Sequence, residues 1–552
     1  MTTLAELAET ADAIASTSSK LEKVRELSAF LARLAGEELA QATRYFAGLV
    51  FPAGDSRTLG IGGAALRTVV VRLTGLDDGS LATIWRDHAD AGDWVGAALR
   101  SATPESAPLP LGDVHAAFEA MASAPGGRAR TDVLFALMRR ITPAESRIVT
   151  KLITGEMRIG LREGLVEESI AAAFDAGPEA VRRASMLLGD LGEVARLAAE
   201  RRLSEARPRW FVPLRFMLAT PVADAAEAVR RLGEQVWVED KYDGIRCQLH
   251  RRRDRVELYS RDLKTISVQF PEIVDAAAAL QHDVMLDGEV LAFHRGKVMP
   301  FQALQTRLGR TAPDRAILDT VPVIYVAWDL LQEDDETLLD LPLRDRRARL
   351  EALDTPQRIA LAHLESVSGE TEINRRFDDA RARLNEGLML KAPGSPYTPG
   401  RRGMTWLKLK RPLDTLDVVV VGAEWGHGKR HGVLSDVTFA VRVDGSDELA
   451  TIGKAYTGLS DGEIAEMTQL LLGITISEHG PYRRVQPLIV LEVAFDNVQV
   501  SSRHKSGYAL RFPRIARWRH DKLVEEIDTL SRVASLTTAH TVEREQLVDR
   551  AG

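Results

Sequence analysis

The residues most suited to chemistry are the charged run Glu239-Asp240-Lys241-Tyr242-Asp243-Gly244, which follows an apolar segment. A lysine at a strand end, beside a glycine that lets a ligand approach the backbone, can act as a nucleophile once its amine is neutral. The run is also typical of an ordinary hairpin turn that carries an exposed lysine, since Asp-Gly is a common turn pair. Six residues alone leave both interpretations open.

Further sets of charged and aromatic residues follow in a fixed order. They are YSR (Tyr259–Arg261), LDGEV (Leu286–Val290), YVAWDLL (Tyr325–Leu331), EGLMLK (Glu386–Lys391), WLKLK (Trp406–Lys410) and RFPRIARWRHDK (Arg511–Lys522). Singly these are weak signals, and WLKLK is equally typical of an amphipathic edge strand. Together with KYDGIR they resemble the motifs of the covalent nucleotidyltransferases, which include ATP-dependent DNA ligases, RNA ligases and capping enzymes.

The resemblance implies that Lys241 attacks the α-phosphorus of ATP and that pyrophosphate leaves, so that AMP becomes bound to the lysine. The reaction requires a deprotonated amine and groups that neutralise phosphate charge. Lys408 and Lys410 are expected to contact the α-phosphate, and their positive charge is expected to lower the pKa of Lys241.

Other motif positions are expected to hold the nucleotide. By resemblance, Glu239 reads the adenine edge and Glu289 binds the ribose. Trp328 is expected to stack on the base, with Tyr325 as a second candidate because a tryptophan here is also typical of a buried strand. Contacts with ribose, phosphate or the leaving pyrophosphate are assigned to Arg246, Arg261, Arg519 and Lys522, with Asp521 in the same motif.

A divalent cation, Mg²⁺ or Mn²⁺, is the expected cofactor beside ATP. The resemblance places it on Glu386, with Glu289 as a further ligand. Phosphoryl transfer needs only one or two carboxylates besides phosphate oxygens, so a small acidic set is sufficient.

The hydrophobic pattern divides the chain into three regions and a tail. Residues 1–205 are rich in alanine and repeat apolar residues at helical spacing, as at Leu21, Val24, Leu27, Leu31 and Leu34, which predicts an all-α domain. The prolines of EARPRWFVP end this pattern. Residues 206–412 alternate short strands with helices, which predicts an α+β domain with antiparallel sheets. Residues 413–535 predict a small OB-fold β-barrel and residues 536–552 a polar tail.

The helical region carries its own signal for nucleic acid. Leu137–Phe174, and within it GEMRIGLREG, resembles the DNA-binding domain of the larger ATP-dependent ligases. Its glycines allow close backbone approach, while Arg158, Arg162 and the nearby Lys151 offer charge for phosphates. Glycine-rich helix connections are also common without DNA. Lys429 and Arg430 are expected to contact DNA from a loop of the barrel.

Composition excludes several alternatives. The chain has 552 residues, 45% of them hydrophobic and 27% charged, which is typical of a globular protein of several domains. The net charge of −7 does not favour indiscriminate nucleic-acid binding. The single cysteine, Cys247, excludes the Cys₄ zinc finger of an NAD-dependent ligase. In WGHGKRHG, Lys429 is followed by arginine rather than Ser or Thr, which does not fit a P-loop.

The N-terminus does not resemble a signal peptide, and no apolar run reaches the roughly 20 residues that are needed to cross a bilayer. A cytoplasmic, nucleoid-associated protein is therefore expected.

The sequence predicts a three-domain, bacterial-type ATP-dependent DNA ligase acting as a monomer that encircles nicked double-stranded DNA. AMP would pass from Lys241 to the 5′-phosphate, and the 3′-hydroxyl would displace it. The barrel is expected to close during the first step. The alternative is a non-catalytic DNA-binding scaffold with a relict site, and a role in replication, repair or recombination stays open.

Overall fold

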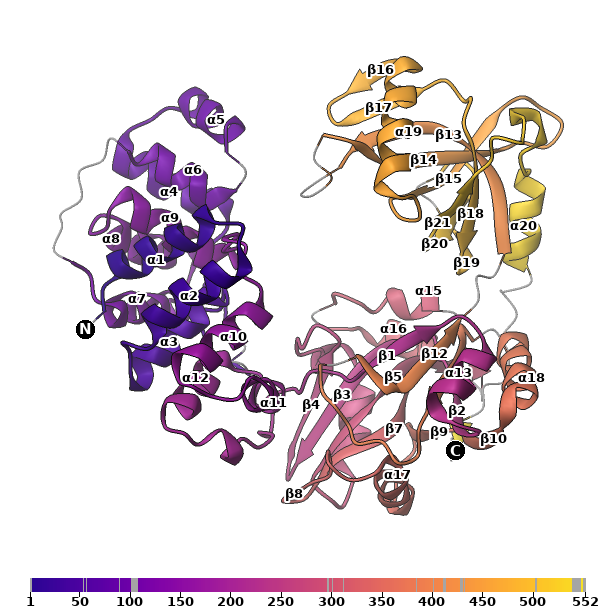
Figure 1. The fold of residues 1–552 in the computed structure, drawn as a ribbon, viewed down its shortest axis with the longest axis horizontal. Helices are drawn as coiled ribbons and strands as arrows, with labels where there is room; N and C mark the ends of the chain where they lie inside the picture. The colour runs from indigo at the N-terminus through magenta and orange to yellow at the C-terminus, as the bar shows by residue number, and fades with distance from the viewer. Residues whose placement is uncertain are drawn as a thin grey trace.

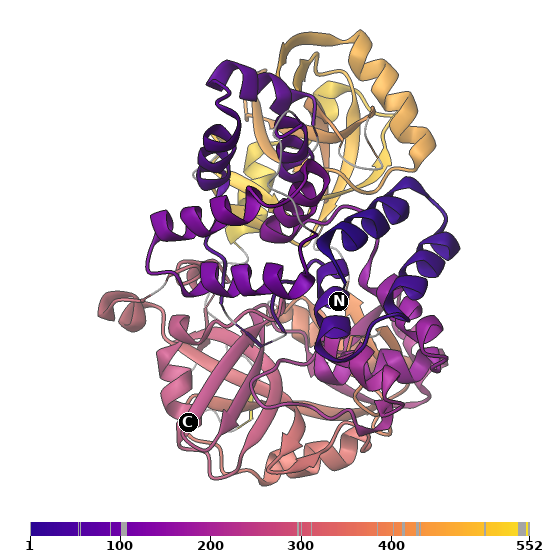
Figure 2. The same cartoon turned by 90° about the vertical axis from the view of Figure 1, so that its left-hand side faces the viewer.

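The computed structural model describes residues 2–538 and 548–549, except residues 53, 56, 89, 101–107, 295–296, 300, 311, 384, 401, 411–413, 427–429, 431 and 502–503. Its ribbon forms three lobes (Figure 1), one helical, one of mixed helices and sheets, and one rich in strands. The view turned by a right angle shows the helices of the first lobe crossing one another as a bundle (Figure 2). This order of lobes confirms the predicted fold classes.

The first lobe consists of helices, as predicted. They are α1 (Leu4–Ser16), α2 (Lys20–Leu31), α3 (Gly36–Phe46), α4 (Gly63–Thr74), α5 (Asp78–Arg86), α6 (Ala91–Ala98), α7 (Leu111–Ser123), α8 (Gly127–Met138), α9 (Pro143–Thr154), α10 (Glu163–Ala173), α11 (Pro178–Leu188), α12 (Leu191–Ala199) and the short η1 (Leu203–Glu205). Local sequence fixes their starts: Ser19 caps α2, and Thr142 and Glu145 form a capping box before α9. Leu27 and Leu31 are buried as expected, whereas Leu21 is 82% exposed, so the apolar stripe begins one turn later than predicted.

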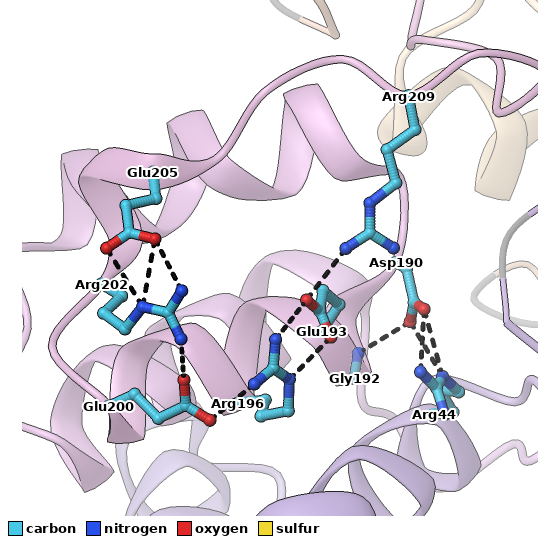
Figure 3. A network of polar contacts seen from close by, with 9 residues as sticks. All are labelled: Arg44, Asp190, Gly192, Glu193, Arg196, Glu200, Arg202, Glu205 and Arg209. Carbon is cyan, nitrogen blue, oxygen red and sulfur yellow. Dashed lines mark hydrogen bonds and ion pairs between the residues drawn. The ribbon is translucent and has the colours of Figure 1, made fainter.

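A polar network closes the end of this lobe (Figure 3). Arg44 of α3 makes a buried ion pair with Asp190, which also caps α12. Glu193 of α12 accepts from Arg196 and from Arg209 of the following segment. The last helices are therefore joined by charge-assisted hydrogen bonds to the segment that leaves the lobe.

That segment is bound along the next lobe by three side chains. The Phe211 N–H donates to His250 Nδ1 over 3.1 Å, and the Leu214 N–H donates to Gln248 Oε1 over 2.8 Å. The Tyr259 hydroxyl donates to the Phe211 carbonyl over 2.9 Å. Burial lowers the pKa of His250 to about 3, so its imidazole is a neutral, fixed hydrogen-bonding group. The boundary expected at EARPRWFVP is thus an ordered connection.

The middle lobe contains two sheets. One has the strand order β1-β12-β11-β2-β10, and the other β22-β9-β7-β5-β3-β4. Most pairings are antiparallel as predicted, while β1 with β12 and β7 with β9 are parallel. The elements are β1 (Leu218–Val222), α13 (Ala225–Leu232), β2 (Gln235–Asp240), β3 (Ile245–Arg252), β4 (Arg255–Ser260), η2 (Ser267–Gln269), α14 (Pro271–Ala278), β5 (Val284–His294), β6 (Lys297–Val298), α15 (Phe301–Gln305), α16 (Arg315–Thr320), β7 (Val323–Glu333), β8 (Glu336–Thr337), α17 (Leu343–Ala352), β9 (Ile359–Ala362), β10 (Leu364–Ser368), α18 (Gly369–Ala382), β11 (Gly387–Lys391) and β12 (Arg402–Lys410).

The run around Lys241 connects these two sheets. Strand β2 ends at Asp240 in the first sheet, and β3 starts at Ile245 in the second. The hairpin interpretation of the Asp-Gly pair is therefore wrong, because the strands on either side of it do not pair with each other. Lys241 lies where the two sheets diverge.

The third lobe is rich in strands, as expected for the C-terminal region. Its elements are β13 (Asp414–Trp425), β14 (Leu434–Arg442), β15 (Leu449–Ala455), α19 (Asp461–Gly473), β16 (Thr475–His479), β17 (Tyr482–Val485), β18 (Val490–Phe495), β19 (Asn497–Val500), β20 (Tyr508–Arg511), β21 (Arg514–Trp518), η4 (Val524–Glu526) and α20 (Leu530–Thr538). The long β13 pairs with β14, β17 and β18. Helix α20 crosses the expected start of the tail at residue 536, and the short β22 (Val548–Asp549) pairs with β9 of the middle lobe. Among the described residues, no helix is both long and apolar enough to cross a membrane.

A buried ion pair joins helix and sheet in the middle lobe. Arg346 of α17 contacts both carboxylate oxygens of Asp329 on β7, at 2.7 and 2.8 Å, and both side chains are 0% exposed. We predict that Asp329→Ala lowers the free energy of unfolding by about 3–5 kcal/mol, because it leaves a buried guanidinium without its counter-charge. Urea unfolding measures this.

The double variant Asp329→Leu/Arg346→Met removes both charges and should cost less than Asp329→Ala. Glu336→Ala, which breaks the exposed pair with Arg349, is the matched control and should cost less than about 1 kcal/mol. Equal losses for Asp329→Ala and Glu336→Ala would contradict the structural role of the buried pair.

Candidate active site

A pocket of about 420 Å³ lies between the facing surfaces of the two sheets. Successive residues of a strand point to opposite faces, so β11 and β12 each give every second residue to the pocket. In β12, Leu407 and Leu409 enter the core, while Lys408 and Lys410 line the pocket. The remaining lining residues are Leu218, Ala219, Glu239, Asp240, Lys241, Tyr242, Asp243, Gly244, Ile245, Arg246, Arg261, Glu289, Trp328, Glu386, Met389, Lys391, Arg511 and Phe512.

Backbone contacts hold Lys241 against the start of β11. Its N–H donates to the Gly387 carbonyl over 2.9 Å, and its carbonyl accepts from the Glu386 N–H over 3.2 Å. Gly387 has a φ of +147°, and a Cβ there would lie 2.1 Å from the Leu409 carbonyl oxygen, so only glycine fits. This close approach places Lys241 Nζ 2.5 Å from Glu386 Oε2.

The charge around Lys241 differs from the sequence expectation. Burial by itself lowers the pKa of Lys241, but the carboxylates of Glu386 and Glu289 outweigh burial, and the pKa is raised. Lys408 and Lys410 were expected to lower it, and this expectation is wrong, because the two glutamates decide the direction of the shift. Lys410 instead contacts Glu386, with Nζ and Oε2 2.5 Å apart.

The pKa values of the two pocket glutamates are shifted in opposite directions. Burial opposes ionisation of Glu386, but Lys241 and Lys410 outweigh it and lower its pKa to about 2. Burial raises the pKa of Glu289 to about 7, even though the Gly244 N–H donates to its Oε1 over 2.8 Å. Glu386 is therefore a fixed anion at neutral pH, and Glu289 titrates near neutrality.

The second sheet supplies an arginine and a tryptophan to the pocket. Arg246 of β3 donates from Nε and Nη2 to Asp287 of β5, at 3.1 and 2.7 Å. Its guanidinium lies 5.5 Å from the ring of Trp328. Tyr325 lies on the opposite face of β7 from Trp328, is 0% exposed and donates to backbone carbonyls in the core. Of the two aromatic candidates, Trp328 lines the pocket and Tyr325 does not.

Glu239 is buried at the back of the pocket and contacts a lysine that the sequence analysis did not select. Lys391 Nζ lies 2.6 Å from Glu239 Oε2 and 4.3 Å from the centre of the Trp406 ring. Lys391 is the last residue of EGLMLK and lies two residues after Met389, on the same face of the strand. This spacing could have indicated from the sequence that Lys391 faces the pocket.

The strand-rich lobe reaches the pocket through residues that the sequence alone did not identify as site residues. Arg511 is ion-paired with Asp243, and Phe512 lines the pocket beside it. Asp496 Oδ2 lies 3.4 Å from Lys410 Nζ. The expected residues Arg519 and Lys522 do not line the pocket in this arrangement.

Arg519 and Lys522 are instead held within their own lobe. Arg519 Nη1 lies 2.9 Å from Asp417 Oδ1, and Lys522 is ion-paired with the same carboxylate. Asp521 contacts Arg519 over 2.8 Å, and this hydrogen bond lowers the pKa of Asp521 to about 2.

Comparisons with known proteins find relatives over nearly the whole chain. Three family descriptions match in order: DNA ligase N terminus over residues 3–171, ATP dependent DNA ligase domain over 216–410 and ATP dependent DNA ligase C terminal region over 430–522. The chain is 44% identical over 568 aligned residues to "Probable DNA ligase" of Koribacter versatilis, covering 99% of this chain and 98% of that protein. It belongs to the ATP-dependent DNA ligases.

A second relative is "DNA ligase" of Archaeoglobus fulgidus, 36% identical over 544 aligned residues, which cover 96% of this chain and 98% of that protein. The solved structure "Pmar-Lig_Pre." superposes with a TM-score of 0.59 over 93% of this chain and 99% of that one, at 16% identity, and supports the fold alone. The protein is therefore an enzyme that seals nicks in DNA with ATP, and the scaffold alternative is not favoured.

The residues expected to contact DNA differ in their exposure to solvent. Arg162 is exposed at the start of α10, and Arg158 is half-exposed beside Glu156. Lys151 is 3% exposed, and its Nζ lies 2.5 Å from Asp90 Oδ2. Lys151 is thus a buried structural cation, and its assignment as a DNA contact is wrong. Arg430 donates to the Tyr456 carbonyl, whereas Lys429 lies outside the described residues.

The carboxylates of the pocket fit a divalent cation that shares its ligands with phosphate. Within the described part of the chain, no group of three His, Cys, Asp or Glu side chains could hold a metal ion by itself. Glu386 and Glu289 both line the pocket beside Lys241. Two carboxylates fit Mg²⁺, which retains waters and phosphate oxygens in its coordination shell.

We predict that Glu386→Gln lowers the pKa of Lys241 in the metal-free ligase, because it removes the carboxylate that most favours the charged amine. The pH dependence of labelling by an amine-reactive reagent, mapped at Lys241 by mass spectrometry, should move to lower pH. Lys454, whose pKa Glu424 raises in the strand-rich lobe, is the internal control and should not change. An unchanged Lys241 profile would contradict the assigned electrostatics.

Proposed function

We propose that the ligase carries AMP on Lys241 and passes it from ATP to the 5′-phosphate of a nick. The observation that supports this most is the position of Lys241 Nζ, inside the pocket and 2.5 Å from the Glu386 carboxylate. In the first step the lysine lone pair forms a bond to the α-phosphorus, the bond to pyrophosphate breaks, and the amine loses a proton to water. Transfer then breaks the N–P bond as a 5′-phosphate oxygen attacks, and the 3′-hydroxyl finally displaces AMP.

The pocket walls suggest a place for each part of ATP. Trp328 would stack on the base and Glu239 would accept from it, while Arg246 and Arg261 would contact ribose or phosphate oxygens; all four line the pocket. Lys408 and Lys410 lie two residues apart on one face of β12 and would neutralise the charge of the α-phosphate. Glu289 would hold the ribose.

Glu386 and Glu289 would hold the Mg²⁺ or Mn²⁺ ion of the reaction. A bound cation would neutralise phosphate charge and, by occupying Glu386, favour the neutral amine of Lys241. The pKa of Glu289, about 7, makes its availability as a ligand pH-dependent. Below that pH its protonated form predominates, so cation affinity should fall with decreasing pH.

The strand-rich lobe would change position during the reaction. Arg519 and Lys522 are ion-paired with Asp417, away from the pocket, whereas Arg511 contacts Asp243 at its mouth. We propose that the lobe turns during adenylation so that Arg519, Asp521 and Lys522 meet the leaving pyrophosphate, and turns back for the DNA steps.

The ligase would act as a monomer at the nucleoid. Its three domains, with boundaries near residues 205, 412 and 535, would all contact the nicked duplex. Arg158 and Arg162 in the helical region and Arg430 in the strand-rich lobe would contact phosphates. Contacts of this kind do not read sequence, which suits an enzyme that seals any nick.

We predict that Lys241→Ala abolishes transfer of label from α-labelled ATP to the protein, because it removes the proposed nucleophile. The same variant should still seal nicked DNA that already carries AMP on its 5′-phosphate, since that step needs no lysine nucleophile. Labelling of the wild-type protein from α-labelled GTP rather than ATP, which would transfer GMP, would indicate capping chemistry. Labelling of the Lys241→Ala protein would disprove the assignment.

We predict different effects for two basic residues of the helical region. Arg158→Ala should weaken binding to nicked duplex and reduce the slope of log K against log salt by about 1, because one phosphate contact is lost. Lys151→Ala should instead lower the free energy of unfolding by about 3–5 kcal/mol, since it leaves the buried Asp90 unpaired. Fluorescence titration and urea unfolding distinguish the two. An unchanged stability of Lys151→Ala would contradict its structural role.

A further inference from the structure

The side chain of Arg246 has a fixed direction in the pocket. Its two hydrogen bonds to Asp287 define the plane of the guanidinium. The ring of Phe216 lies 4.7 Å from the guanidinium carbon and that of Trp328 5.5 Å from it. Small movements of Asp287 would therefore change where Arg246 meets a nucleotide.

Asp287 is itself held by a tyrosine outside the quoted motifs. The Tyr397 hydroxyl donates to Asp287 Oδ2 over 2.8 Å, and this is the oxygen that also accepts from Arg246 Nη2. The Met217 N–H donates to the same hydroxyl over 3.1 Å. Because that donor occupies a lone pair of the hydroxyl oxygen, the hydroxyl proton is directed to Asp287.

The surroundings give Tyr397 little freedom. Tyr397 is 2% exposed, and its ring packs edge-on against that of Trp406 with the ring centres 5.8 Å apart. Its backbone N–H donates to the Leu339 carbonyl over 2.8 Å. Burial raises the pKa of Tyr397 well above its usual value, so the hydroxyl keeps its proton. Asp287 is 0% exposed, and a buried carboxylate requires partners for its oxygens.

We propose that Tyr397 is a positioning residue for ATP, acting through Asp287 on Arg246. This rests on the proposed function, in which Arg246 contacts the ribose or phosphates. The hydroxyl of Tyr397 does not need to touch the nucleotide. It fixes the carboxylate that fixes the guanidinium, and it joins this pair to Met217, next to the pocket residues Leu218 and Ala219.

Tyr325 provides a matched control. It is 0% exposed in the same lobe, and its hydroxyl donates to the carbonyls of Cys247 and Leu286, at 3.0 and 3.1 Å. Tyr325→Phe and Tyr397→Phe each remove one buried hydroxyl without creating a large cavity. Only the second removes a hydrogen bond to the partner of Arg246.

The test measures the rate of Lys241 adenylation against ATP concentration in the full chain, together with thermal unfolding. Tyr397→Phe should raise the half-saturating ATP concentration about 3- to 10-fold, since a hydrogen bond to a charged group is lost, and leave the maximal rate within about twofold. Tyr325→Phe should leave the ATP dependence unchanged.

A double-mutant cycle tests the route. In an Arg246→Ala background, Tyr397→Phe should cause little further change in ATP dependence, because its effect passes through Arg246. Equal ATP shifts for the two Tyr→Phe variants, no shift for Tyr397→Phe, or full additivity with Arg246→Ala would each overturn the proposal. If Tyr397→Phe does not fold, Asp287→Asn, which should shift ATP dependence in the same direction, replaces it in the cycle. Labelling of Lys241→Ala would instead disprove the proposed function.

Discussion

The ion pair between Lys241 and Glu386 is the constraint around which the pocket is built. An ammonium group removed from water is costly unless a counter-charge lies beside it, and here β2 and β11 bring that charge to 2.5 Å. The approach depends on Gly387, because any side chain there would collide with β12. The same carboxylate also contacts Lys410, so the reactive lysine and a phosphate-binding lysine share one anion. The raised pKa of Lys241 thus keeps its amine charged beside these carboxylates.

The remaining pocket geometry follows from strand alternation on two facing sheets. Apolar residues of β2, β11 and β12 enter one core, and those of β3, β5 and β7 enter another. The residues between them face each other across the pocket. Polar side chains of these walls are paired with each other or with a buried partner: Glu239 with Lys391, and Arg246 with Asp287. Such pairs hold charged groups in fixed directions where burial limits their hydration.

The two junctions between lobes differ physically. The connecting segment joins the helical lobe to the middle lobe: its N–H groups donate to the buried side chains of Gln248 and His250, and Arg209 donates to Glu193 of the helical lobe. The strand-rich lobe reaches the pocket through ion pairs such as Arg511 with Asp243 and Lys410 with Asp496. Partly exposed ion pairs cost less to break than buried hydrogen bonds, so the second junction is the one suited to rearrangement.

Sequence by itself determined the family, the order of the three regions and the kind of secondary structure in each, because these depend on local motifs, apolar periodicity and capping residues. It also indicated that Lys241, Glu289, Glu386 and Lys410 belong together. Only the tertiary structure decided what depends on burial and distance. Lys151 is basic in the sequence but buried against Asp90, Trp328 and Tyr325 lie on opposite faces of one strand, and the pKa of Lys241 follows the nearest carboxylates rather than the nearby lysines. Charge and aromatic character are read from the chain, but electrostatic effects act through space, where residues distant in sequence become neighbours.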